Sequence, residues 1–249
     1  HLGLVQASEN AELETFLESA ATLIKDHVDL PALQKLAVVP TLASDQIDPF
    51  IFAARHIAVA CDAAFTFCYP HFERAWRQAG IKISRFSPLA NEAPNLDADF
   101  IYLPGGYPEL HLPQLSKADA FLAALKAAKA KHVPIYGECG GYMVMGQSIT
   151  GKDGISYPMA DLLPIQTSFA RPKLHLGYRQ VSLIENGPLA IQNTSYRAHE
   201  FHYACEIQKS ENSRPLFAAK DALGKDLGDT GAMDGSAFGS FIHLIDEAN

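Results

Sequence analysis

The order of apolar runs after Arg55 restricts the fold of this chain more than any other feature. His56–Ala60 is a short apolar run without polar alternation, as expected of a strand covered on both faces. We expect further strands at Lys82–Phe86, Asp99–Leu103 and Val133–Tyr136, and helices at Phe72–Ala79 and Ala118–Lys131. Alternating elements with short connections predict an α/β fold with a doubly wound, mainly parallel sheet. In such a sheet, functional residues lie in loops beyond the carboxyl ends of the strands.

After Gly151 the pattern changes to shorter segments of β character. These segments are Leu174–Leu183, His199–Ile207 and Ala237–Leu244. We see no second domain boundary among them and expect an antiparallel extension of the same domain. That domain is predicted to cover residues 51–249.

Residues 1–50 differ from the rest and are predicted to form a helical segment. Asn10–Lys25 places apolar residues near one helical face, with Asn10 as the expected N-cap. Asp29 is expected to start a second, short helix, followed by a polar connector at Thr41–Pro49. We interpret this segment as a helical appendage that precedes the predicted domain.

Composition excludes several classes of protein. Of the 249 residues, 48% are hydrophobic, which rules out a disordered chain, and no apolar run is long enough to span a membrane. A formal charge of −8 argues against nucleic acid as the main partner. Four cysteines without C-x-x-C spacing are expected to be reduced thiols of a cytoplasmic protein. The chain starts with His1 rather than Met, so we expect it to be part of a longer one.

The strongest local motif surrounds Cys139. An apolar strand runs into Gly137-Glu-Cys-Gly-Gly141, and an apolar helix-like stretch follows. This is a nucleophile elbow with Cys in place of Ser. The sharp turn requires flanking glycines and places the sulfur at a helix N-terminus, where we expect the thiolate to be favoured. The N–H of Gly140 would then face an oxyanion. The alternative is a buried structural cysteine in a glycine-rich turn.

A second strand end carries another glycine pair, Gly105 and Gly106, within Tyr102–Glu109. Glycines at this position let backbone N–H groups approach a ligand closely, so this loop is a candidate for the second oxyanion donor. By itself, Pro-Gly-Gly is also ordinary turn chemistry.

A cysteine nucleophile requires a base, and two regions offer one. His243 is expected at the end of an apolar strand near the C-terminus. His199 and His202 lie within Arg197–Tyr203, where strand alternation places their imidazoles on opposite faces. The residues alone do not decide between these two regions. A zinc site built from His199, His202 and a cysteine fits this spacing poorly, so no metal is expected.

Four motifs, taken together, resemble those of a known family. They are Pro104–Glu109, Gly137–Met143, Arg197–Tyr203 and the late strand that ends in His243. As a set they resemble the glutamine amidotransferase domain of the cobyrinic acid a,c-diamide synthase family, a cobalamin-pathway group of class I glutaminases. The resemblance covers about residues 55–246.

The resemblance implies roles for the matched residues. Cys139 would attack the side-chain amide of glutamine, His243 would serve as the base, and Gly106 and Gly140 would form the oxyanion hole. The cluster at Arg197–Tyr203 would line the site or the interface with the synthetase domain. This fragment would need no cofactor of its own. Residues 1–50 would be a helical linker from a missing N-terminal ATP-binding domain, which is the synthetase domain. ATP and Mg would act there, and that domain would use the ammonia to amidate a corrin-type acceptor such as cobyrinic or hydrogenobyrinic acid.

One position departs from the family pattern. Triad glutaminases carry Glu two residues after the histidine, where this chain has Ile245. Glu138 and Glu200 are candidates for the orienting carboxylate, because Asp246 and Glu247 are displaced from the usual position. Three alternatives remain open: an amidotransferase acting on another tetrapyrrole (cobyric acid synthase-like), a non-catalytic domain that docks onto a synthetase, and a Cys-dependent hydrolase of the same fold.

Overall fold

The computed structural model describes residues 7, 10–38, 52–190, 192–209 and 213–248. The chain divides into two compact units, His1–Ile47 and Asp48–Asn249. The predicted connector at Thr41–Pro49 and the predicted boundary after residue 50 lie outside the described residues. No helix in these ranges combines the length and the apolar character needed to cross a membrane.

The first unit contains two helices, as the sequence predicts. They are α1 (Leu13–His27) and α2 (Leu30–Leu36). Asp29 caps α2 by accepting a hydrogen bond from the N–H of Ala32 at 3.0 Å. The prediction of Asn10 as the cap of α1 is wrong, because Glu12 occupies that position. Asn10 instead accepts from the N–H of Glu12 and closes the turn that precedes the helix.

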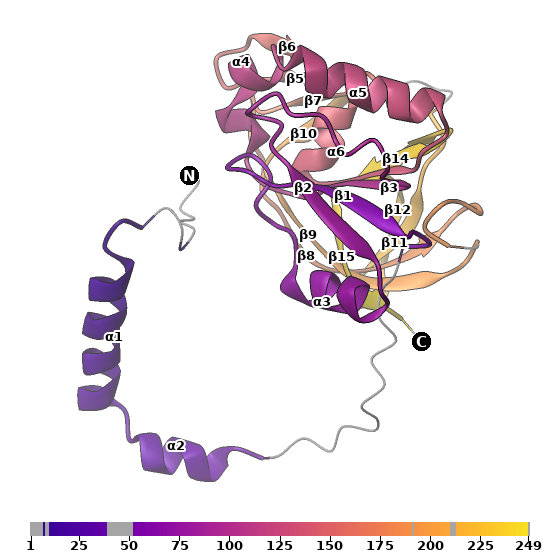
Figure 1. Cartoon of the computed structure of the whole chain (residues 1–249). Coiled ribbons are helices and arrows are strands. Elements are labelled where there is room, and N and C mark those ends of the chain that lie inside the picture. Colours follow the sequence, from indigo (N-terminus) through magenta and orange to yellow (C-terminus); the bar gives the residue numbers. More distant parts are fainter. Residues whose placement is uncertain (1–6, 8–9, 39–51, 191, 210–212, 249) are drawn as a thin grey trace. The chain divides into compact units, whose positions relative to one another are not determined.

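A six-stranded sheet forms the centre of the second unit (Figure 1). Its strands are β1 (His56–Ala60), β2 (Lys82–Phe86), β3 (Phe100–Leu103), β4 (Ile135–Glu138), β13 (Ala232–Asp234) and β14 (Ala237–Ser240). The order is β13-β14-β4-β3-β1-β2, and every pair is parallel except β13 with β14. All five residues of β1 are buried, which confirms a strand covered on both faces.

One face of this sheet packs against helices and a small second sheet. The helices are α4 (Leu112–Leu115), α5 (Asp119–Ala130) and α6 (Gly140–Met145), and the 3-10 turn η2 (Pro108–Leu110) precedes them. The second sheet contains β5 (Ser148–Thr150), β6 (Ser156–Pro158), β7 (Ile165–Ser168) and β10 (Cys205–Lys209). Phe121 and Leu125 of α5 and Ile149 of β5 share one buried cluster with Ile101 and Ile135 of the central sheet.

The opposite face packs against α3 and a five-stranded antiparallel sheet. These elements are α3 (Pro70–Gln78), β8 (His175–Leu183), β9 (Ser195–His202), β11 (Phe217–Asp221), β12 (Asp226–Thr230) and β15 (Ile242–Glu247). Trp76 of α3 and Leu244 of β15 belong to the same buried cluster as Tyr102 and Tyr136 of the central sheet. Figure 1 shows α3 and α5 on opposite sides of β1 and β3. The α/β fold with a mainly parallel sheet and an antiparallel extension is therefore confirmed.

Two predicted strands are each broken into two that belong to different sheets. Ala237–Leu244 divides into β14 and β15, because the chain turns at Phe241, where the hydroxyl of Ser240 accepts the N–H of Ile242 at 3.1 Å. His199–Ile207 likewise divides at Tyr203 between β9 and β10. His243 is therefore the second residue of β15 and does not end a strand, which corrects that expectation.

Candidate active site

Cys139 occupies a strained turn between β4 and α6. Its φ of 48° and ψ of −105° lie where a non-glycine residue is rarely found, which confirms the predicted elbow geometry. Its N–H donates to the carbonyl of Ser240 at 2.8 Å and ties the turn to β14. A Cβ at Gly141 would lie 1.9 Å from the carbonyl oxygen of Leu103. Only glycine lets α6 start so close to β3.

The thiol of Cys139 is buried, and its surroundings favour the neutral form. Cys139 is 7% exposed, and its Sγ donates to the carbonyl of Phe201 at 3.9 Å. Burial, followed by the nearby Glu109, raises the pKa of this thiol above its usual range, and the N–H of Gly140 offsets this only in part. The expectation of a favoured thiolate is therefore wrong. The six-residue helix α6 does not compensate for the lost hydration.

His243 reaches the same place from the antiparallel sheet. It pairs with His199 of β9 in the strand register, and the two rings stack in parallel with centroids 4.7 Å apart. Tyr69 and Nε2 of His199 share a short hydrogen bond. Burial, and to a smaller extent His199 and His202, lower the pKa of His243 to about 3. The imidazole is therefore neutral at physiological pH and able to accept a proton.

Gly105 separates the thiol from the imidazole. A Cβ at Gly105 would lie 2.6 Å from Cε1 of His243 and 3.5 Å from Cβ of Cys139. The loop after β3, the elbow after β4 and the start of β15 therefore converge at one point. The absence of a side chain at Gly105 allows Cys139 and His243 to flank the same space. This is the constellation expected of a nucleophile and its base.

Glu138 is the carboxylate that accompanies His243. Its side chain is fully buried on β4 and accepts hydrogen bonds from the hydroxyls of Tyr102 (2.8 Å) and Tyr136 (3.0 Å) and from the N–H of Leu244 (3.1 Å). Its Oε2 lies 3.8 Å from Nδ1 of His243, which is longer than a hydrogen bond. That nitrogen is buried, and no hydrogen-bond partner for it lies among the residues that the structure describes. Burial raises the pKa of Glu138 to about 7, although the three hydrogen bonds act in the opposite direction.

The other carboxylates considered from the sequence lie elsewhere. Asp246 pairs with Arg197 at 3.6 Å, and both side chains are largely exposed. Glu200 accepts from Nε and Nη2 of Arg179 at 2.8 and 2.7 Å, and its other oxygen lies 2.8 Å from Nε2 of His202. Burial raises the pKa of Glu200, but the bonds and charges of His202 and Arg179 outweigh it and hold the pKa at about 2.

The two predicted oxyanion donors are neighbours. A Cβ at Gly140 would lie 3.2 Å from the backbone nitrogen of Gly106, so the two glycines face each other beside Cys139. Gly106 has no room for a side chain, because a Cβ there would lie 2.1 Å from the carbonyl oxygen of Ala64. Their role as an oxyanion hole stays a prediction.

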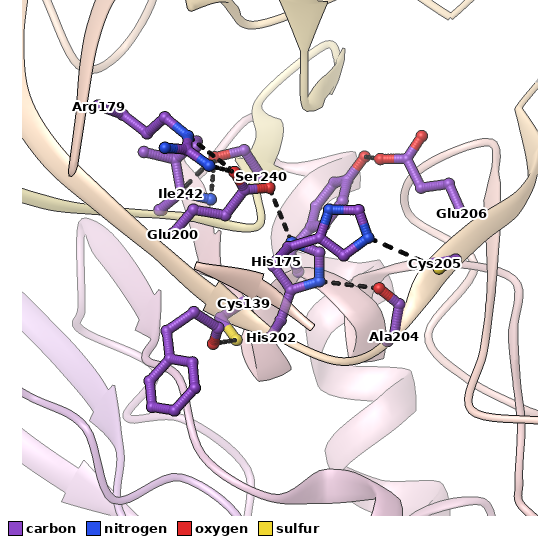
Figure 2. A network of polar contacts seen from close by, with 12 residues as sticks. Cys139, His175, Arg179, Glu200, His202, Ala204, Cys205, Glu206, Ser240 and Ile242 are labelled. Atoms are coloured by element: carbon purple, nitrogen blue, oxygen red, sulfur yellow. Dashed lines mark hydrogen bonds and ion pairs between the residues drawn. The ribbon is translucent and has the colours of Figure 1, made fainter. Parts of the chain in front are cut away.

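The segment Arg197–Tyr203 divides between two places. His199 stacks on His243, whereas His202 stacks on His175 and Phe241, with centroids 4.7 and 4.0 Å apart. The prediction that the two imidazoles face opposite sides of the strand is thus confirmed. Figure 2 shows Glu200 and His202 gathered with His175, and Cys139 nearby.

Sequence reasoning missed three residues of the site. Tyr102 and Tyr136 are in register on neighbouring strands and both donate to Glu138. The sequence of β4 could have indicated the pairing of Tyr136 with Glu138. The two residues are two positions apart, so they lie on the same face of the strand. Gly105 was noted as a turn residue, and its position between Cys139 and His243 requires the tertiary structure.

Comparison with known proteins gives a consistent result. A sequence profile of the CobB/CobQ-like glutamine amidotransferase domain matches residues 56–249. The chain is 48% identical over 248 residues to a hydrogenobyrinate a,c-diamide synthase of Brucella anthropi, matching 99% of this chain and 56% of that protein. A protein of the same name from Rhodobacter capsulatus is 43% identical over 98% of this chain and 55% of its own length. The chain thus spans little more than half the length of these relatives.

Solved structures share the fold at low sequence identity. The structure of PurLQS from Thermotoga maritima gives a TM-score of 0.53 at 15% identity and covers 76% of this chain and 87% of its own. A glutamine amidotransferase from Thermotoga maritima gives a TM-score of 0.50 at 15% identity and covers 76% of this chain and 75% of its own.

Proposed function

The chain belongs to the CobB/CobQ-like glutamine amidotransferase family, and from this premise we propose that it hydrolyses glutamine through a thioester on Cys139. The observation that carries the proposal is the convergence of Cys139 and His243 on either side of Gly105. A strained cysteine elbow beside a neutral imidazole matches what acyl transfer requires.

The reaction follows from the protonation states. The thiol and the imidazole are both neutral at rest, so the Cys139 proton passes to His243 as Sγ attacks the amide carbon of glutamine. His243 then returns that proton to the leaving nitrogen, which departs as ammonia. A water molecule activated by His243 hydrolyses the γ-glutamyl thioester and releases glutamate. The N–H groups of Gly106 and Gly140 are placed to stabilise the oxyanion that forms in both steps.

Glu138 takes the role of the missing third triad member in this proposal. It approaches Nδ1 of His243 from the strand that carries the nucleophile, whereas triad glutaminases supply this carboxylate from the position that is Ile245 here. The gap of 3.8 Å closes on binding of glutamine, as catalytic hydrogen bonds commonly tighten in the substrate complex. Tyr102 and Tyr136 hold the carboxylate in place.

The acceptor is inferred from relatives. Because the similar proteins are named hydrogenobyrinate a,c-diamide synthase, we infer that the ammonia amidates the a and c carboxylates of cobyrinic or hydrogenobyrinic acid. The part of the relatives that this chain does not match would be the synthetase domain, where ATP and Mg²⁺ activate the carboxylates. Residues 1–50 would link the two domains of a cytoplasmic enzyme. An acceptor of the cobyric acid type is the alternative within the family.

Covalent labelling tests the proposal directly. We expect a chloroketone analogue of glutamine to alkylate Cys139 of the full-length protein, to abolish ammonia release, and to be excluded by glutamine. Cys61 is an exposed thiol of the same chain and serves as the internal comparison, because simple alkylation would modify it first. Peptide mass spectrometry identifies the labelled residue.

The same experiment tests the docking alternative, which the burial of the thiol favours. Labelling of Cys61 with Cys139 unmodified, together with no ammonia release, would support a non-catalytic domain and contradict the proposal. Labelling of Cys139 that glutamine does not slow would indicate a hydrolase for another substrate.

The Glu138→Gln variant is expected to lower kcat by at least about 100-fold, because a triad histidine loses rate when its orienting carboxylate is replaced by an amide. Glutamine keeps the volume and leaves an acceptor for Tyr102 or Tyr136, so the variant is expected to fold. In the parent protein Glu138 is neutral below its pKa of about 7 and becomes a carboxylate that accepts from His243 above it. Parent kcat should therefore rise as the pH increases through about 7, and the variant should lack that rise. A variant with the parent profile would assign Glu138 a purely structural role.

A further inference from the structure

His175, Glu200 and His202 form a second polar cluster, which the glutaminase mechanism does not use; we refer to it as the His–Glu–His cluster. Nitrogen and oxygen atoms of the three side chains lie within 4.8 Å of one another. Glu200 and His202 are on β9, His175 is on the neighbouring strand β8, and Cys205 starts β10 beside them (Figure 2). An open pocket of about 300 Å³ gives access to all four residues.

The hydrogen bonds of His202 direct one of its ring nitrogens at Glu200. Nδ1 lies 2.8 Å from the carbonyl of Ala204, which only accepts, so Nδ1 carries a hydrogen. Nε2 lies 2.8 Å from Oε1 of Glu200, which as a carboxylate also only accepts. The ring nitrogen that Ala204 leaves free therefore points at a carboxylate oxygen, and together these two atoms can serve as ligands of a divalent cation.

The outer contacts of the cluster are those of a metal site. Metal-binding histidines usually donate their second ring nitrogen to a carbonyl or carboxylate, as His202 does to Ala204. Metal-binding carboxylates are themselves hydrogen-bonded, and Arg179 holds the second oxygen of Glu200. His202 is further fixed by ring stacking between His175 and Phe241. The donors are thus positioned before any ion arrives.

A fourth candidate donor borders the three clustered residues. Sγ of Cys205 lies 3.9 Å from Nε2 of His175 and borders the same pocket. Two imidazoles, one carboxylate and one thiol are ligands that Zn²⁺ prefers, whereas Mg²⁺ and Ca²⁺ prefer oxygen alone. Zn²⁺ would bind Nε2 of His202, Oε1 of Glu200 and a ring nitrogen of His175, and the Cys205 thiol would lose its proton to solvent on coordination.

We propose that His175, Glu200 and His202 bind Zn²⁺, with Cys205 as the fourth ligand. The sequence-based expectation rejected a zinc site of His199 and His202, and the strand geometry still excludes that pair. The site proposed here joins β8, β9 and β10 instead. The proposed zinc site is close to the proposed nucleophile in space. Phe201 lies between the ligands Glu200 and His202 in the sequence, and its carbonyl accepts the hydrogen bond of the Cys139 thiol.

Metal binding is measured without reference to glutaminase activity. The full-length protein is stripped with a chelator and titrated with Co²⁺, and Zn²⁺ is then added as a competitor. We expect one Co²⁺ per chain, with the absorption bands of a four-coordinate ion and a thiolate-to-cobalt band that Zn²⁺ abolishes. The Cys205→Ser variant should lose the thiolate band and retain Co²⁺.

Single-ligand variants decide whether the ion occupies this site. His175→Gln and His202→Gln should each weaken Zn²⁺ binding by more than the roughly 10- to 100-fold typical of an outer contact. His132→Gln, at an exposed histidine far from the cluster in sequence, is the matched control and should bind like the parent. His175 is only partly buried, so its variant is expected to fold even if the more buried His202 variant does not.

Two results would overturn the proposal. Parent protein that binds neither ion would show that His202 and Glu200 form only a hydrogen bond. Binding that the His175 variant does not weaken would assign the ion to another place. Neither result affects the proposed glutaminase, because that proposal is tested by labelling of Cys139.

Discussion

Replacement of Cys139 by Ala should abolish glutamine hydrolysis, with kcat falling by about a million-fold, the scale seen when a hydrolase loses its nucleophile. No other thiol can substitute, because the elbow holds Cys139 at a positive φ beside His243 and Gly105. Alanine adds no volume at this buried position, so the fold should survive. Ammonia release from glutamine by the full-length protein measures the effect.

Two controls isolate the role of the sulfur. Cys61→Ala removes an exposed thiol and should leave the rate unchanged. The Cys139→Ala protein should still amidate its acceptor when ammonia is supplied directly, because only the source of nitrogen is lost. Ammonia release from glutamine at the parent rate by Cys139→Ala would contradict the thioester mechanism. Loss of both activities would indicate misfolding, which the thermal unfolding midpoint of the variant would reveal.

The central sheet and the elbow were predictable from sequence because their signals are local. β1 and β2 occur at the predicted residues. β1 is an apolar run and β2 is a short segment that follows Gly80, so each can be recognised without reference to distant partners. The elbow followed from Gly137 and Gly141 around Cys139. A Cβ at Gly141 would lie 1.9 Å from the carbonyl oxygen of Leu103, so no side chain fits there.

The breaks between sheets were not predictable in the same way. Ala237–Leu244 is buried throughout, although the chain passes from the central sheet to the antiparallel one at Phe241. Because the residues before and after the turn are all buried, the hydrophobic pattern of the sequence does not change where the chain leaves the central sheet. Only the bond from the N–H of Ile242 to the Ser240 hydroxyl marks the change of direction.

The chemistry of the site depends even more on residues that are distant in sequence. The helix N-terminus predicted a thiolate at Cys139, but the strands that bury the sulfur raise its pKa. The orienting role proposed for Glu138 depends on β15, which brings Nδ1 of His243 to 3.8 Å from Oε2 of this residue. The sequence named Glu138 and Glu200 as alternatives, and the structure separates them because Glu200 is held by Arg179 and His202.

Replacement of His243 by Ala should lower kcat by about 10⁴- to 10⁶-fold, nearly as much as loss of the nucleophile, because the two residues act as one unit. The thiol is neutral at rest and cannot attack unless a base accepts its proton. Burial holds the pKa of His243 at about 3, so that base is available throughout the physiological range. The double variant Cys139→Ala/His243→Ala should be no slower than either single variant.

His199 provides the matched comparison, because it was the rival base and its ring stacks on His243. If His243 is the base, His199→Gln should reduce kcat far less than His243→Ala, by an amount that reflects lost stacking. The reverse order would transfer the role to His199, whose Nε2 is engaged by Tyr69. Since that bond occupies the ring nitrogen that a base needs, the structure favours His243. Steady-state glutaminase assays of the two variants, run beside their unfolding midpoints, measure this difference.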